Sequence, residues 1–160
     1  MKAVVYLMCG LPGSGKTTLA KRLESESRAM RFSIDEWMLN FYGEIMSRAE
    51  FDERSERCEK MIWNIAERLL LLGFSVILDF GFWKREKRRE YQTRINKAGA
   101  HMVLYYVQTP YEVLQRRLET RNKKLPDGAF YISAEMLQVF VAQFEYPTEA
   151  EGFEMVEVRS

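Results

Sequence analysis

The sequence predicts an α/β fold, a three-layer sandwich in which helices cover both faces of a central, mostly parallel sheet. Two observations support this prediction. Short apolar runs typical of buried strands alternate, along all 160 residues, with segments whose apolar residues recur at helical spacing. No repeat, low-complexity tract or Pro/Gly/Ser-rich linker interrupts the alternation. The length suits one compact core, so we expect residues 1–160 to form a single domain.

The first half of the chain supplies two strands and two helices. The continuous apolar run at residues 4–9 is typical of a strand buried on both faces. A glycine-rich loop then leads into a helix over 16–27, and a second short strand is expected at 31–34. A long helix over 47–73 begins with a Ser/Glu capping-box pattern and ends at a glycine, so its apolar stripe should pack on the sheet.

The same rhythm continues in the second half. A buried-strand run at 74–78 is followed by an aspartate, a charged helix is expected over 84–98, and the next strand over 101–107. Residues 109–112, Thr-Pro-Tyr-Glu, supply an N-cap, a proline at the first helical position and a capping-box acid for a further helix.

That helix should end near Arg121 and lead into a segment without clear periodicity. Residues 122–132 contain Pro126 and Gly128, and a serine then caps a final helix over 134–144. We expect residues 116–133 to form a small lid beside the site.

Composition excludes several classes of protein. A hydrophobic share of 47% is too high for a disordered chain, and no apolar run approaches the roughly 20 residues of a membrane span. A signal-peptide cleavage pattern is missing, so we expect a cytoplasmic protein. Cys9 and Cys58 have no zinc-site spacing and are interpreted as packed thiols. The net charge of +1 gives no global field for nucleic acid.

The loop between the first strand and the first helix reads GLPGSGKT and matches the pattern GxxxxGK[ST]. Glycines let successive backbone N–H groups point at phosphate oxygens, Lys16 reaches the β and γ phosphates, and Thr17 ligates magnesium. The sequence therefore predicts binding of ATP, or another nucleoside triphosphate, with Mg²⁺. The residues expected at the nucleotide are Gly10, Leu11, Pro12, Gly13, Ser14, Gly15, Lys16, Thr17 and Thr18.

The remaining residues favour phosphoryl transfer over switching or hydrolysis. A GTPase switch needs an NKxD-type base reader, but neither Asn96-Lys97 nor Asn122-Lys123 is followed by the aspartate. Hydrolysing ATPases often place a glutamate after the metal-associated aspartate, whereas here Asp79 is followed by Phe80. A phosphotransferase acting on an alcohol group is the class that these residues indicate.

Two carboxylates follow expected strands. Asp79 stands at the carboxyl edge of the sheet and is expected to hold Mg²⁺ through water; a turn or capping role is the alternative. Asp35 is a candidate base for the acceptor hydroxyl, although Ser33 and Glu36 form a capping-box pattern and Asp35 could instead cap a helix.

Arginines at the start of the lid are candidates for binding the transferred phosphate. Arg117 and Arg121 are four residues apart and share a helix face, so a closing lid could bring them over the phosphates. The alternative is an exposed face paired with Glu112 or Glu119, and Arg116 is expected to be solvated.

The segments GLPGSGKTT, SID, LDFGFW, RRLETRN and FEYP together resemble the small P-loop kinases, the group of phage polynucleotide kinase, chloramphenicol phosphotransferase and zeta toxins, and most nearly the "predicted kinase" or "AAA family ATP-binding protein" set. The resemblance implies a five-stranded sheet with the kinase-type strand order and an acceptor site between Asp35 and the lid. It also implies a base at Asp35, lid arginines at Arg117 and Arg121, and a basic acceptor-site position at Arg88.

Aromatic residues follow both strand-end acids. Trp37 and Trp83, with Phe41, Tyr42 and Phe82, could line an acceptor pocket, or could belong to the core.

Three functions follow from these residues. The first is transfer to a small-molecule hydroxyl acceptor resembling a nucleoside, antibiotic or sugar. The second is a 5′-hydroxyl polynucleotide kinase, suggested by the resemblance and by the basic residues 84–89, although glutamates interrupt that run as on a solvated helix face. The third is a nucleotide-binding regulatory module. No membrane partner is expected, and the chain could be a monomer or a homodimer.

Overall fold

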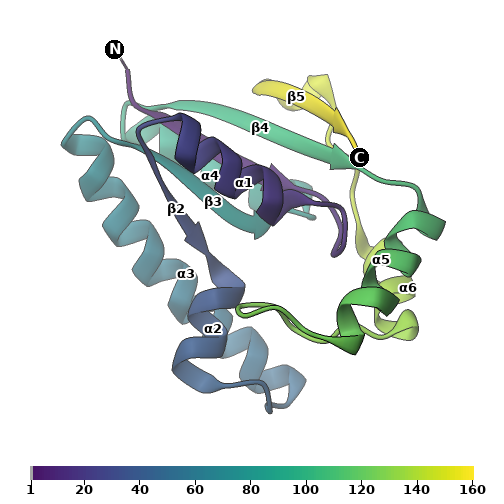
Figure 1. The fold of residues 1–160 in the computed structure, drawn as a ribbon. Coiled ribbons are helices and arrows are strands. Elements are labelled where there is room, and N and C mark those ends of the chain that lie inside the picture. The colour runs from purple at the N-terminus through teal and green to yellow at the C-terminus, as the bar shows by residue number, and fades with distance from the viewer. Residues whose placement is uncertain (1) are drawn as a thin grey trace.

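A computed structural model describes residues 2–160. Five parallel strands form one sheet in the order β2-β3-β1-β4-β5. Figure 1 shows the sheet with helices on both sides; β1 begins at one end of the sheet and β5 ends at the other. The strands are β1 (Val4–Cys9), β2 (Ala29–Ser33), β3 (Ser75–Gly81), β4 (His101–Gln108) and β5 (Glu154–Arg159); the helices are α1 (Lys16–Glu26), α2 (Ile34–Tyr42), α3 (Arg48–Leu71), α4 (Arg85–Lys97), α5 (Tyr111–Lys123) and α6 (Ala134–Gln143), with a 3-10 turn η1 (Glu149–Glu151).

The two faces of the sheet bury separate apolar clusters. On β3, Ile77 belongs to the cluster under α1, whereas Val76 and Leu78 belong to the larger cluster that α3 and α4 cover. This alternation follows from the two-residue period of a strand. In Figure 1, α1 lies in front of the sheet and α4 behind it, so the expected three layers are confirmed.

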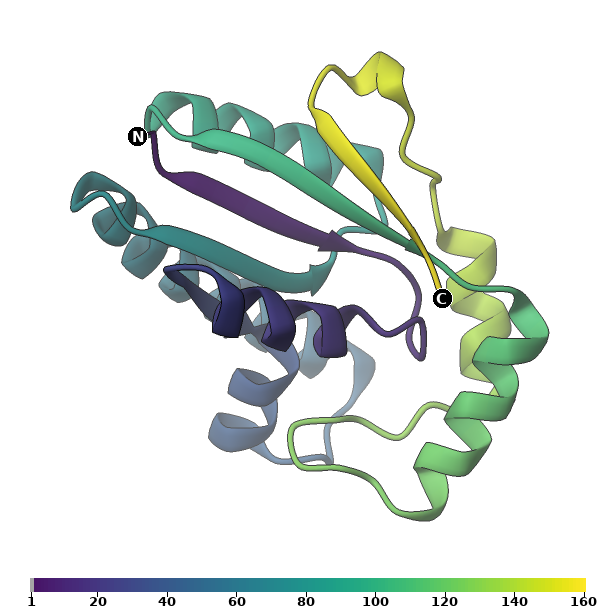
Figure 2. The ribbon, with the colours of Figure 1, turned by 45° about the horizontal axis from the view of Figure 1, so that its top comes forward.

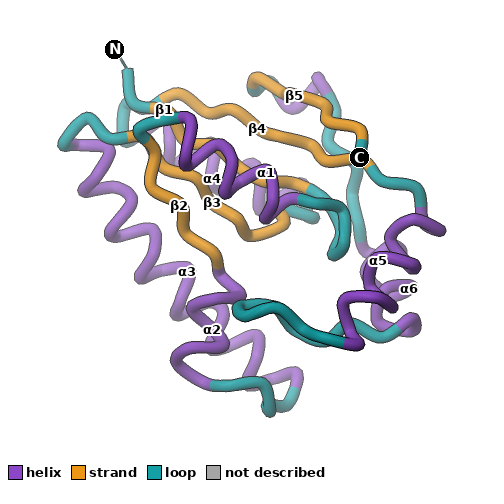
Figure 3. The backbone as a smooth tube through the Cα atoms, in the orientation of Figure 1, coloured by secondary structure: helices purple, strands orange, loops and turns teal. Residues whose placement is uncertain are grey.

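Helices α5 and α6 form an arm with a small core of its own, beyond the carboxyl ends of the strands (Figure 2). The loop between them runs to α2 and back, as Figure 3 shows. There Phe130 packs edge-on against Phe51 at 5.7 Å between ring centroids. A Cβ on Gly128 would lie 2.5 Å from the Glu36 Cγ, so the loop touches α2 directly.

Most element positions agree with the sequence predictions, and the differences have local causes. The Ser47–Glu50 capping box and the Ser133 cap are present. The box predicted around Thr109 is wrong: Pro110 is the N-cap of α5, and the Thr109 hydroxyl instead donates to the Ser14 carbonyl at 3.2 Å. Strand β5 was not predicted from the apolar pattern. Over residues 2–160, no helix is long and apolar enough to cross a membrane.

Candidate functional site

The glycine-rich loop between β1 and α1 has the backbone of a phosphate-binding loop. Gly13 has φ +81°, and a Cβ there would lie 3.1 Å from the Leu118 Cγ; at Gly10 it would lie 2.8 Å from the Val107 carbonyl oxygen. Helix α1 has Gly15 as its N-cap, without a side-chain cap, and has no acid in its first turn. Its N–H groups and dipole are thus left for an anion.

Neither the Lys16 ammonium nor the Ser14 hydroxyl has a side-chain partner among residues 2–160. The Lys16 ammonium donates to the Leu11 carbonyl at 2.8 Å, and burial lowers its pKa, against the opposing effects of Asp79 and Asp35. The Ser14 hydroxyl is buried and has no hydrogen-bond partner within the described chain. The unpartnered Ser14 hydroxyl and the charged Lys16 ammonium fit a bound triphosphate, whose oxygens accept hydrogen bonds from both.

Asp79 reaches the loop from the carboxyl end of β3. Its Oδ2 accepts a hydrogen bond from the Thr17 hydroxyl at 2.8 Å. An oxygen pair of this kind suits Mg²⁺, which takes few protein ligands and keeps water and phosphate oxygens. Among residues 2–160 no group of three or more His, Cys, Asp or Glu side chains could hold a metal alone. Thr17 and Asp79 are therefore the residues that would hold Mg²⁺ beside the phosphates; Thr18 follows with an exposed side chain.

Arg31 is a site residue that the sequence analysis missed. Its guanidinium lies 3.5 Å from the same Asp79 oxygen and 2.6 Å from the Glu36 carboxylate, and its side chain is 9% exposed. The detectable signal was an arginine inside a short strand that is otherwise apolar. It places a positive charge beside the Asp79 and Glu36 carboxylates.

Asp35 lies in the first turn of α2, after the Ser33 N-cap, whose hydroxyl accepts from the Glu36 N–H at 3.4 Å. Because Ser33 caps α2, the Asp35 carboxylate is not the N-cap of this helix. Although the side chain is exposed, desolvation by the surrounding protein and the negative charge of Asp79 raise the Asp35 pKa to about 6, against the opposing charges of Lys16 and Arg121. The Asp35 carboxyl group therefore keeps its proton at higher pH than an ordinary aspartate does.

Two arginines of α5 face this region. Arg121 donates to the Phe130 carbonyl at 3.1 Å, while its buried Nε has no partner in residues 2–160. Burial lowers the Arg121 pKa and the Asp35 charge raises it. Arg117 donates to the Gly13 carbonyl at 3.3 Å and to the Ser160 hydroxyl at 2.9 Å. Both lie beside the phosphate-binding loop or Asp35, as a phosphate-neutralising role requires.

The same helix face borders a hollow of about 500 Å³. Arg116, expected to be only solvated, lines it together with Val113, Arg117, Thr120 and Arg121.

Arg88, expected at the acceptor pocket together with Trp37 and Trp83, is instead buried in the core. Arg88 is fully buried and forms a two-pronged ion pair with Glu151, at 2.8 Å for each nitrogen–oxygen pair. Its guanidinium is thus a structural tie in the core, and the structure corrects the acceptor-site prediction. The Trp83 indole donates to the Gly10 carbonyl at 2.8 Å. Trp37 is half-buried beside Phe41 and remains near Asp35 in sequence.

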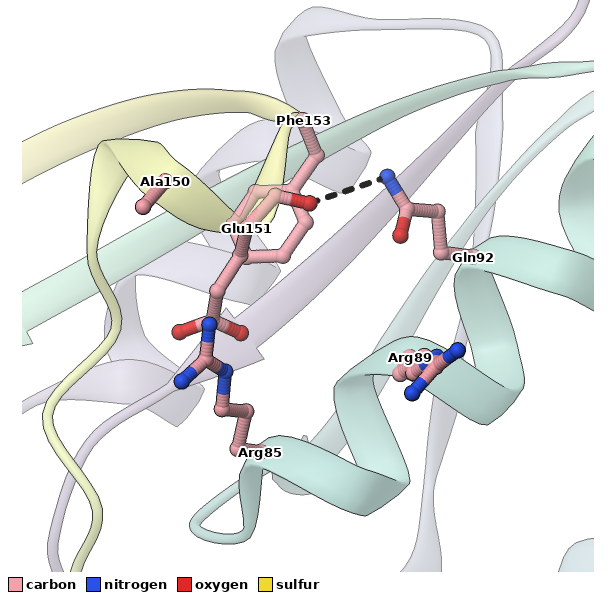
Figure 4. A pocket seen from close by; sticks show the side chains of 6 residues that line it. All are labelled: Arg85, Arg89, Gln92, Ala150, Glu151 and Phe153. Atoms are coloured by element: carbon pink, nitrogen blue, oxygen red, sulfur yellow. Dashed lines mark hydrogen bonds between the residues drawn. The ribbon is translucent and has the colours of Figure 1, made fainter.

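A second hollow, of about 240 Å³, lies between α4 and the chain around η1. Figure 4 shows exposed Arg85 and Arg89 on α4, and Gln92 donating to the Glu151 carbonyl. The phosphate-binding loop does not line it. The lining residues are Arg85, Arg89, Gln92, Ala150, Glu151 and Phe153.

Known proteins share this architecture. A family model described as an AAA domain (AAA_33) matches residues 5–147. A protein from Chloroflexus aurantiacus J-10-fl, assigned as a kinase, gives a TM-score of 0.78 at 20% identity over 99% of this chain and 89% of the other. Kti12 of Chaetomium thermophilum, in complex with ADP-AlF3, gives 0.74 at 17% identity over 97% and 88%. A chain of the Pnkp1/Rnl/Hen1 RNA repair complex gives 0.67 at 25% identity over 88% of this chain and 43% of that one.

These comparisons agree with the observed architecture. The five-stranded parallel sheet in the order β2-β3-β1-β4-β5 is that of the P-loop kinases, and the family match includes both the phosphate-binding loop and the arm. The chain therefore belongs to the AAA domain family and has the fold of its small P-loop kinases.

Proposed function

We propose that the chain is an ATP-dependent phosphotransferase that moves the γ-phosphate to a hydroxyl group of a small molecule resembling a nucleoside, antibiotic or sugar. The observation that carries this proposal is Asp35, whose pKa is raised to about 6 next to Lys16, Asp79 and Arg121. Binding of a nucleotide alone needs no such carboxylate, whereas transfer to an alcohol benefits from a base that titrates near working pH.

The proposed reaction assigns one task to each group. Asp35 accepts the proton of the acceptor hydroxyl as its oxygen bonds to the γ-phosphorus. The bond from that phosphorus to the bridging oxygen breaks, and ADP leaves with the electron pair. Lys16 and the loop N–H groups hold the phosphates, and bound Mg²⁺ supplies charge neutralisation there. Arg121 offers its unpartnered Nε to the charge that develops on the transferred group.

The arm gives a reason for transfer rather than hydrolysis. Its loop already touches α2 at Glu36 and α3 at Phe51, so it spans the side on which Asp35 lies. Closure of the arm over a bound acceptor would exclude water that competes with it. Kti12, which has the same fold, forms a complex with ADP-AlF3, and this supports nucleotide binding as part of the proposal.

Transfer of labelled γ-phosphate into a pooled panel of nucleosides, aminoglycosides, sugars and other hydroxyl compounds tests the proposal. We expect a labelled product with the wild type, a loss of at least about 100-fold with Asp35→Asn, and no change with Asp52→Asn, an exposed carboxylate paired with Arg48. Nucleotide binding without transfer to any acceptor class would instead indicate a regulatory module.

A second candidate, a 5′-hydroxyl polynucleotide kinase, is favoured by the basic hollow on α4 and by the likeness to a chain of an RNA repair complex. If it is correct, a 5′-hydroxyl oligonucleotide is phosphorylated, and binding weakens steeply with added salt. Arg85→Gln with Arg89→Gln should then reduce transfer to the oligonucleotide. If transfer to the oligonucleotide is unaffected by added salt and by these substitutions, the polynucleotide kinase candidate is rejected.

A further inference from the structure

Trp83 joins two parts of the molecule that are distant in sequence. Its indole N–H donates to the Gly10 carbonyl, at 2.8 Å, at the start of the phosphate-binding loop. Its ring lies 4.8 Å, between centroids, from the ring of Phe140 in α6. Gly10 is also held by its own N–H, which donates to the Gly81 carbonyl at 3.1 Å. Both backbone groups of Gly10 are therefore fixed by the turn between β3 and α4.

That turn presents the indole in one orientation. Gly81 has φ +92°, and a Cβ there would lie 2.8 Å from the Trp83 Nε1, so only glycine leaves room. Phe82 has φ +44°, a conformation that a phenylalanine holds only when its surroundings enforce it. Its carbonyl accepts from Arg88 at 3.0 Å and from the Cys9 thiol at 3.4 Å.

Hydrogen bonds also connect this turn to the chain that follows α6. The Trp83 carbonyl accepts from the Glu145 N–H at 3.0 Å and from Arg88 at 3.2 Å. The same arginine donates to the Glu145 carbonyl at 2.9 Å, and Glu151 neutralises its charge. Burial of this ion pair makes the support rigid, because a charge without its partner would be costly there.

The other end of the connection reaches the lid arginines. Leu137 of α6 shares the core of the arm with Leu114 and Leu118 of α5. The same helix α5 carries Arg117 and Arg121. A displacement of the arm therefore changes the Phe140 contact with Trp83.

We propose that Trp83 is a positioning residue that couples the position of the α5–α6 arm to the backbone of the nucleotide-binding loop. Lys16 donates to the carbonyl of Leu11, the residue after Gly10, so the anchored peptide adjoins the one that holds the phosphate-binding ammonium. An arm seated on Trp83 keeps that segment in the geometry that receives the triphosphate. The inference rests on the proposed nucleotide site, but not on the identity of the acceptor.

Calorimetric titration of the full chain with Mg²⁺ and ATP tests the coupling. Trp83→Phe retains a ring for Phe140 but removes the donor to Gly10, and should weaken binding about 5- to 10-fold, the value of one neutral hydrogen bond. Phe140→Leu should weaken it about 3-fold through the ring contact. The matched control is Trp63→Phe, a buried tryptophan that packs on Tyr91 in the α3–α4 layer. It should lower the melting temperature and leave the dissociation constant unchanged.

The double variant Trp83→Phe, Phe140→Leu supplies a readout that a merely structural role would not move. If the two residues act through one connection, the double variant raises the dissociation constant by less than the product of the two single-variant factors. Equal losses of affinity in Trp83→Phe and Trp63→Phe, or a strictly multiplicative double variant, would overturn the coupling while leaving the proposed function standing. Should Trp83→Phe fail to fold, Phe140→Leu decides: unchanged affinity overturns the inference. A wild type that binds no nucleotide overturns the proposed function itself, and the inference with it.

Discussion

Asp35→Asn exchanges a carboxylate for an amide of nearly the same size, and we expect it to move activity and stability in opposite directions. Transfer should fall by about 10² to 10⁴, because the base for the acceptor hydroxyl is lost. The folded protein should become more stable near neutral pH, because desolvation and the Asp79 charge disfavour the Asp35 carboxylate in the folded state.

The size of the stabilisation follows from the pKa. Desolvation by the surrounding protein and the Asp79 charge raise the Asp35 pKa from 3.8 to about 6. At about 1.4 kcal/mol per pH unit, a difference of about 2 corresponds to an upper bound of about 3 kcal/mol. The exposed side chain is screened by solvent, so we expect about 1 kcal/mol. For a chain of this size, that raises the melting temperature by about 2–4 °C.

The pH dependence has a definite sign. The folded state binds this proton more tightly than the unfolded state, so the wild type loses stability as pH rises from about 4 to about 6. Asp35→Asn lacks the group, so its advantage should be absent below about pH 4 and complete above about pH 6. Thermal melts of both proteins from pH 3.5 to 7.5, with Asp52→Asn as control, measure it. A variant that is less stable at pH 7.5, or equally shifted at every pH, would refute the environment described for Asp35; wild-type transfer rates in the variant would refute its role as base.

Further substitutions separate binding, stability and transfer. Lys16→Ala should weaken Mg²⁺-ATP binding about 100-fold, since a charge-assisted contact to phosphate is lost, with the melting temperature nearly unchanged; calorimetry and thermal melts check both. Arg88→Met should lower the free energy of unfolding by about 3–5 kcal/mol, because Glu151 is left buried without its partner. Arg89→Met, on the exposed face of the same helix, should change it by less than about 0.5 kcal/mol. Urea titrations measure both. Arg121→Gln should reduce transfer by about 10³, with nucleotide affinity largely retained. It should also move the rising limb of the pH profile of kcat/KM to higher pH, because a charge that lowers the Asp35 pKa is removed. A rising limb that stays in place contradicts the effect of Arg121 on Asp35.

Local signals explain what the sequence predicted. The first strand was placed correctly at residues 4–9 because a fully buried strand reads as a continuous apolar run. The phosphate-binding loop was recognisable because its glycines, lysine and threonine are adjacent in sequence. Strand β5 lies at the sheet edge, where Glu154 and Glu157 face solvent, so its sequence carries too weak an apolar signal.

The errors concern contacts between distant residues. Arg88 stands on a charged helix and reads as a surface residue, yet its partner Glu151 is 63 residues away and closes over it. Trp83 contacts Gly10 across 73 residues, a contact that no local periodicity could predict. Thr109 illustrates the same limit, because a capping pattern competes with a hydrogen-bond acceptor that only the fold supplies.

The fate of the labelled γ-phosphate tests the central claim most directly. The wild type is incubated with γ-labelled ATP, Mg²⁺ and the acceptor panel, and the label is partitioned between phosphorylated acceptor and inorganic phosphate. We predict that most of the label enters an acceptor hydroxyl, and that Asp35→Asn reduces this product at least about 100-fold while still binding the nucleotide. Release of inorganic phosphate alone, at a rate that depends on neither acceptor nor Asp35, would contradict the account.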